Sequence, residues 1–113
     1  MLIFTLKKEW YEKIRRGEKT VEYRAVKPYW TKRIRNEIER NGVFEEDLRM
    51  TKCFDLFGKA MCLFECRLRL GYTKRFMSAT IVKIVKMNGK DTDLAIDAPV
   101  YAIHLADVKE CAQ

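Results

Sequence analysis

The stretch that decides the fold of this chain is Gly17-Glu18-Lys19-Thr20-Val21-Glu22-Tyr23-Arg24. Its glycine suits the left-handed position that commonly ends a helix, and the residues from Thr20 onward alternate as β-favouring residues do in a strand. Successive side chains of a strand point to opposite faces. One face therefore carries Val21 and Tyr23, with Tyr23 predicted to lie in the core, and the other carries Thr20, Glu22 and Arg24.

The charged face of this strand has two interpretations. Glu22 and Arg24 can form a surface ion pair, which contributes roughly 0–1 kcal/mol, or they can line the edge of a cleft. Lys19 joins them only if it lies on the turn after the glycine, because a strand position would point it to the opposite face. An arginine fork binds phosphate or a base edge, and a carboxylate accepts from an exocyclic amine. The three residues together therefore suit a nucleotide.

Regular elements are predicted on both sides of this stretch. Residues 2–6 alternate as a strand, and residues 7–16 have a helical repeat with an apolar stripe of Trp10, Tyr11 and Ile14. A second helix is predicted from Thr31 to the Asn41-Gly42 pair, with an apolar spacing of four set by Trp30, Ile34 and Ile38. No regular element is predicted for 43–58. Further strands are predicted at 60–70, 76–87 and 100–105, separated by a turn at 71–75, the turn signal Asn88-Gly89 and an acidic loop at 91–98.

The order of these elements, β-α-β-α followed by several strands, lacks the regular alternation of a doubly wound sheet. It predicts an α+β fold, a small mixed β-barrel flanked by two or more helices. The chain of 113 residues suits a single domain, 1–113. It has no apolar stretch of about 18 residues, so no membrane-spanning helix and no membrane partner are expected. The N-terminal residues indicate a first strand rather than a signal peptide.

The four cysteines are expected to be reduced thiols of a cytoplasmic protein, because no secretion signal accompanies them. Cys62 and Cys66 would both face the core from one strand. The only histidine is His104, and a structural zinc site needs four ligands. We therefore expect neither a metal nor a cofactor.

The positive charge is concentrated in two blocks. The formal net charge is +7, and residues 1–41 carry +6 and residues 59–90 carry +7, whereas the remaining segments are net acidic. Such a field attracts phosphate polyanions, although a solubilising surface without a partner is the alternative. In the second block, the predicted nucleic-acid contacts are Arg67, Arg69, Tyr72, Lys74 and Arg75, with Tyr72 placed to stack on a base.

The stretch 17–24 resembles the G-x-K-x-x-E-x-R signature of ASCH domains, which are relatives of the RNA-binding PUA domain. In that family the signature follows a strand and an amphipathic helix, the order predicted here. Segments 29–34, 71–72 and 100–105 are also similar, so the resemblance covers nearly the whole chain. It implies a PUA-like barrel, a cleft around Lys19, Glu22 and Arg24, and a role in RNA metabolism.

The resemblance also implies a catalytic alternative. Small bacterial family members are amidohydrolases that remove the acetyl group from acetylcytidine, and others are associated with ribonuclease activity. In such a metal-independent hydrolase, Lys19 and Glu22 would be the catalytic acid–base residues. The deacetylating members have a threonine nucleophile three residues after the lysine, where this chain has Glu22.

Three hypotheses therefore compete. The favoured one is binding of RNA or a modified nucleoside without chemistry. The second is the hydrolase. The third is a protein-interaction adaptor that uses the acidic residues 91–97 or the helix at 30–41.

Overall fold

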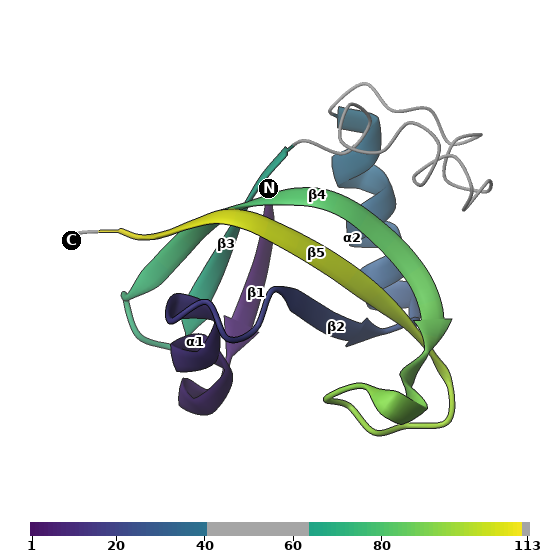
Figure 1. Ribbon diagram of the computed structural model, residues 1–113. Helices are drawn as coiled ribbons and strands as arrows, with labels where there is room; N and C mark the ends of the chain where they lie inside the picture. The colour runs from purple at the N-terminus through teal and green to yellow at the C-terminus, as the bar shows by residue number, and fades with distance from the viewer. Residues whose placement is uncertain (41–63, 112–113) are drawn as a thin grey trace.

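The fold, seen in a computed structural model that describes residues 1–40 and 64–111, is a five-stranded sheet curled into a half-barrel with two helices against it (Figure 1). The strand order is β1-β3-β4-β5-β2. Strands β1 (Leu2–Leu6) and β3 (Phe64–Leu70) are parallel, and the other neighbours are antiparallel. The remaining elements are β2 (Val21–Ala25), β4 (Phe76–Asn88), β5 (Pro99–Glu110), α1 (Lys8–Arg15) and α2 (Pro28–Arg40). The predicted α+β, barrel-like fold class is confirmed at this level.

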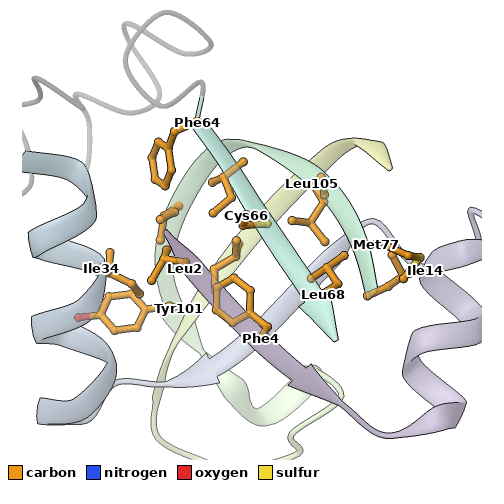
Figure 2. Close-up of a cluster of buried hydrophobic side chains, with 14 of the residues drawn as sticks. Leu2, Phe4, Ile14, Ile34, Phe64, Cys66, Leu68, Met77, Tyr101 and Leu105 are labelled. Atoms are coloured by element: carbon orange, nitrogen blue, oxygen red, sulfur yellow. The ribbon is translucent and has the colours of Figure 1, made fainter. Parts of the chain in front are cut away.

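The core lies on the concave face of the sheet. Because successive side chains of a strand point to opposite faces, every second side chain enters this core. In β1 the residues alternate between buried and exposed, and β3 begins with the same alternation. Figure 2 shows side chains from four strands meeting in this core, with Ile14 of α1 and Ile34 of α2 closing its two ends. Phe4 is fully buried and stacks on Trp30 of α2, with ring centroids 5.2 Å apart. The predicted apolar faces of 2–6 and of the second helix are therefore confirmed.

Two irregularities let β4 and β5 curl around this core. The register between them shifts at Ser78/Thr80 and again at Ile81/Lys83, and β-bulges of this kind bend and twist a strand. The second shift moves the buried position from Ile81 to Ile84, three residues on. The long strands can thus keep an apolar concave face while the sheet turns back on itself.

Helix α1 ends as the sequence predicts. Gly17 has a φ of +79°, and the amide of Glu18 donates to the carbonyl oxygen of Lys13 at 2.9 Å. This is the left-handed termination that favours glycine, because a Cβ is penalised there. It reverses the chain so that β2 starts only a few residues later.

Two predicted boundaries were wrong. Helix α2 begins at Pro28 rather than Thr31, because proline fits the first helical position, where no amide donor is needed. The last strand runs to Glu110 rather than 105. Its polar end pairs with Met77 and Ser78 of β4, a long-range partnership that a short polar segment does not reveal.

Some predictions fall outside the described residues. These are the start of the strand at 60–63, the helix end at Asn41-Gly42, the irregular segment 43–58 and the position of Cys62. Within the described ranges, neither helix is long and apolar enough to cross a membrane.

The buried thiol of Cys66 leads to a prediction on pH. Burial raises its pKa from 9.0 to about 12, so the folded protein keeps the proton that the unfolded chain loses. This stabilisation is complete below pH 9.0 and is lost as the pH rises toward 12, at about 1.4 kcal/mol per pH unit. Urea unfolding across this range should show a shallower decline for Cys66→Ala than for the wild type. Parallel declines would contradict the assignment.

Candidate functional site

The candidate site lies where the two edge strands of the half-barrel, β1 and β2, approach each other. They are the first and last strands of the sheet order, so no ladder of backbone hydrogen bonds joins them. Instead, Nη2 of Arg24 on β2 donates to the carbonyl oxygen of Thr5 on β1 at 3.0 Å. A side chain therefore connects the two edges of the sheet.

The polar face of β2 points toward the inside of the half-barrel. Glu22 pairs with Ile103 of β5, and Arg24 pairs with Tyr101. Directly opposed residues of antiparallel strands lie on the same face, and both of these β5 residues are buried. The interpretation of this face as an ordinary solvent-exposed surface does not hold for Glu22, which is only 6% exposed.

The carboxylate of Glu22 is held between two cations. Its Oε2 accepts from Nη2 of Arg24 at 2.7 Å, and its Oε1 lies 3.5 Å from Nζ of Lys19. The second distance is longer than a normal hydrogen bond, so Oε1 keeps capacity to accept from a ligand. Removing one partner of a buried ion pair costs more than the pair contributes, so this carboxylate depends on both cations.

Lys19 joins the site because it lies on the turn between Gly17 and β2, as the sequence analysis required. Its ammonium contacts Asp93 as well as Glu22, and it lies 5.0 Å from the ring centroid of Tyr23 and 5.3 Å from that of Trp10. Cations above aromatic faces are attracted by the ring quadrupole. Lys19 is thus fixed by two carboxylates and two rings.

The guanidinium of Arg24 is fixed as firmly. Its central carbon lies 5.3 Å from the ring centroid of Phe4 and 5.1 Å from that of Trp30. Its Nε is buried and has no hydrogen-bond partner among the described residues. These contacts make Arg24 the link between the core, both sheet edges and Glu22.

Around these residues is a cleft of about 530 Å³, a size typical of small-ligand pockets. It is bordered by the end of β1, the start of α1, β2 and the loop after β4. Its walls include Trp10, Tyr23, Leu94 and Ile96. The charged residues lining it are three basic and three acidic: Lys7, Lys19, Arg24, Glu9, Glu22 and Asp93. Its formal charge is therefore balanced, and aromatic and apolar side chains accompany the polar groups.

Two aromatic predictions are corrected here. Tyr23 was predicted to lie in the core, but it faces away from the concave side, is half-buried and lines the cleft. Trp10 was grouped with Tyr11 and Ile14 as an apolar stripe, yet only the latter two are buried. The helical repeat predicted which side of α1 packs against the sheet. It did not predict that Trp10, at the margin of that side, lines the cleft instead of the core.

Asp93 is a site residue that the sequence analysis missed. It lies in the acidic loop after β4 and contacts a lysine 74 positions earlier in the chain. The acidity of the loop was visible in the sequence, but its partner depends on the tertiary fold. On the other side of this ion pair is a smaller hollow of about 300 Å³, and the exposed Thr20 lines this hollow rather than the cleft.

The predicted residues of the second basic block lie apart from the cleft. Arg67 and Arg69 extend from the outer face of β3, and Tyr72 and Lys74 lie on the turn that follows. Arg67 covers the ring of Phe76 at 4.7 Å, and Tyr72 is 91% exposed. None of these four lines the cleft.

Arg75 has a structural partner instead. Its Nη2 lies 2.7 Å from Oε2 of Glu110, an oxygen that also accepts from the hydroxyl of Tyr11 at 3.1 Å. The hydrogen bond from Arg75, followed by that from Tyr11, lowers the pKa of Glu110. Burial, aided by the bond to Glu110, raises the pKa of Tyr11 to about 12. This network joins α1 to the ends of β4 and β5.

No group of three or more His, Cys, Asp or Glu side chains within residues 1–40 and 64–111 is arranged to hold a metal ion. No protein-family model, no curated protein and no solved structure matches this chain.

Proposed function

We propose that this chain is a PUA-like, ASCH-type domain that binds RNA or a modified nucleoside, and that its cleft holds the base. The observation that carries the proposal is the convergence of Lys19, Glu22 and Arg24 on one cleft, with the Glu22 carboxylate buried between the two cations. A carboxylate accepts from the exocyclic amine of cytosine, and an aromatic wall stacks on a base. The chemistry of the cleft thus suits a nucleobase.

The balanced charge of the cleft supports a neutral base rather than a phosphate as its occupant. Asp93 already lies on the Lys19 ammonium, in the place that a ligand phosphate would take. The proposed compartment is the cytoplasm, which agrees with the free thiols of Cys66 and Cys111, the two cysteines in the described part of the chain.

Tryptophan fluorescence tests the proposal, because Trp10 lines the cleft whereas Trp30 packs on Phe4. Cytidine should quench the wild type in a saturable way, and Trp10→Phe should remove that signal. Binding of cytidine should depend little on salt, whereas binding of single-stranded RNA should weaken as salt rises. Absence of saturable binding of both ligands would refute the proposal.

A second candidate function is the metal-independent hydrolase. The observation in its favour is that Nζ of Lys19 and Oε1 of Glu22 lie 3.5 Å apart in the cleft, with each side chain less than a tenth exposed. Such a pair can pass a proton to or from a reacting group. Incubation with acetylcytidine and with a short RNA, followed by mass spectrometry, tests it. Product that the wild type forms and Lys19→Ala does not would make the protein an enzyme.

Replacing Asp93 by asparagine should raise the affinity for cytidine monophosphate but not for cytidine. The change frees the Lys19 ammonium for a phosphate, and a partly exposed ion pair of this kind limits the gain to about fivefold. Calorimetric titration of both ligands measures it. Asp91→Asn, an exposed change in the same loop, serves as the control. Equal gains for both ligands or for both variants would contradict this role of Asp93.

A further inference from the structure

A separate pocket, the convex pocket, lies on the opposite, convex face of the sheet. It measures about 260 Å³ and is lined by Ile3 of β1, Arg67 and Arg69 of β3, Thr73 and Lys74 of the following turn, and Phe76 of β4. It contains three basic residues and, among the described residues that line it, no acidic one. Its formal charge of +3 contrasts with the balanced charge of the cleft.

The described part of the chain supplies no carboxylate that pairs with the three cations of this pocket. No ion pair involves Arg67, Arg69 or Lys74 within the described ranges. Arg69 Nε donates to the carbonyl oxygen of Thr73 at 3.0 Å, a bond that orients the side chain and uses one of the five N–H donors of the guanidinium. Cations held close together without carboxylates attract a polyanion.

The turn that carries Lys74 is itself well ordered. The hydroxyl of Thr73 donates to the carbonyl oxygen of Leu70 at 2.6 Å, and the amide of Leu70 donates to the carbonyl oxygen of Arg75 at 3.0 Å. Tyr72 lies on this turn, next to the pocket-lining Thr73 in the chain, and is 91% exposed, whereas Ile3, which lines the pocket, is 48% exposed. An exposed aromatic ring on the same turn as a pocket-lining cation is the combination that binds single strands, through base stacking and phosphate contacts.

Edge strand β1 connects the convex pocket with the cleft. Ile3 lines the convex pocket, whereas Thr5, two residues later, lines the cleft. The register partners of these residues on β3 are Arg67 and Arg69. Two residues along a strand span about 7 Å. A polynucleotide that extends from the cleft across β1 would therefore reach the cations of the convex pocket within about that distance.

We infer that the convex pocket binds the phosphodiester backbone of a single-stranded RNA whose base occupies the cleft. The inference rests on the proposed function and specifies its ligand as a polynucleotide rather than a free nucleoside. The cleft then selects the base, and the electrostatic part of the affinity comes from Arg67, Arg69 and Lys74. Tyr72 adds a stacking surface for a base beyond the cleft.

Fluorescence anisotropy with a labelled single-stranded RNA of about twelve nucleotides tests this inference, with cytidine as the ligand of the cleft alone. The variant carrying Arg67→Gln and Lys74→Gln should bind the RNA about tenfold or more weakly. Its plot of log affinity against log salt should be shallower by about 1.4, since each phosphate contact on a single strand contributes about 0.7. Its affinity for cytidine should be unchanged.

The matched control carries Lys32→Gln and Lys90→Gln. It removes the same charge from exposed positions on α2 and the turn after β4, far from the turn between β3 and β4 (Figure 1). Tyr72→Ala should weaken RNA binding about tenfold, and Tyr72→Phe should restore it, because stacking needs only the ring. Equal losses in the control pair and the Arg67/Lys74 pair would overturn the inference.

The remaining outcomes separate this inference from the proposed function. If Glu22→Gln abolishes cytidine binding while the Arg67/Lys74 pair binds RNA normally, the cleft proposal stands and the convex contact is refuted. If the pair loses RNA while Glu22→Gln binds cytidine normally, the convex contact stands and the cleft proposal is refuted. The double variant Arg67→Gln/Lys74→Gln is also tested for binding to anionic phospholipid vesicles. If it loses vesicle binding but binds RNA normally, the convex pocket recognises a membrane surface and the inference is overturned.

Discussion

Replacing Arg24 by alanine is expected to lower the free energy of unfolding by about 3 to 5 kcal/mol. The change leaves the buried Glu22 carboxylate with Lys19 as its remaining cation, at 3.5 Å. It also removes the donor to the Thr5 carbonyl oxygen, which is the side-chain link between β1 and β2. The change also removes the guanidinium that packs against the rings of Phe4 and Trp30.

Urea unfolding of Arg24→Ala beside Lys27→Ala measures this effect. Lys27 is an exposed cation just beyond β2, so its loss should cost no more than about 0.5 kcal/mol. A double-mutant cycle with Glu22→Gln separates the ion pair from the aromatic packing, and contacting residues should show a coupling energy of about 0.5–3 kcal/mol. A loss for Arg24→Ala as small as that for Lys27→Ala would mean that the ion pair does not hold the two edges together.

The second large effect concerns ligand selection by Glu22. If Oε1 accepts from the exocyclic amine of cytosine, cytidine should bind more tightly than uridine, which has a carbonyl oxygen in place of that amine. Glu22→Gln should reduce the affinity for cytidine by about 10- to 100-fold, the range expected for one good base contact. The preference over uridine should disappear, because the amide can donate as well as accept.

Fluorescence titration of both nucleosides against three proteins tests this prediction. Glu9→Gln is the matched control, because Glu9 lines the same cleft but is exposed and near the start of α1. The wild type and Glu9→Gln should both prefer cytidine. Equal affinity of the wild type for cytidine and uridine would show that Glu22 does not select the base. The thermal unfolding curve of each variant checks that it is folded.

Much of the fold was predictable because it depends on short-range patterns. The alternation in residues 2–6 predicted the buried face of β1, and Gly17 predicted the left-handed turn after α1. The sequence left the position of Lys19 open between this turn and the strand, and it lies on the turn because β2 begins only at Val21. The chain does leave the strand at Asn88-Gly89, where a 3-10 helix begins the loop that ends at Pro99, and a Cβ on Gly89 would lie 2.6 Å from Cγ1 of Val100.

Predictions were wrong where a boundary or a face depends on a distant segment. The polar end of β5 is a strand because Met77 and Ser78 pair with it. Tyr23 is at the cleft because the concave side of β2 carries Glu22 and Arg24, opposite the buried Ile103 and Tyr101 of β5. No local pattern states which side of an amphipathic edge strand turns inward.

Local chemistry was therefore sufficient to place Lys19, Glu22 and Arg24 near one another, since they lie within six residues on one turn and strand. The contacts that make them a site were decided by the curl of the sheet, which brings β2 to β1 and places Asp93 on Lys19. The same long-range geometry put Arg67, Arg69 and Lys74 of the second basic block on the convex face instead of in the cleft. Side-chain periodicity is set by bonds between neighbours along the chain, whereas strand order and curvature are set by pairings between residues far apart in it.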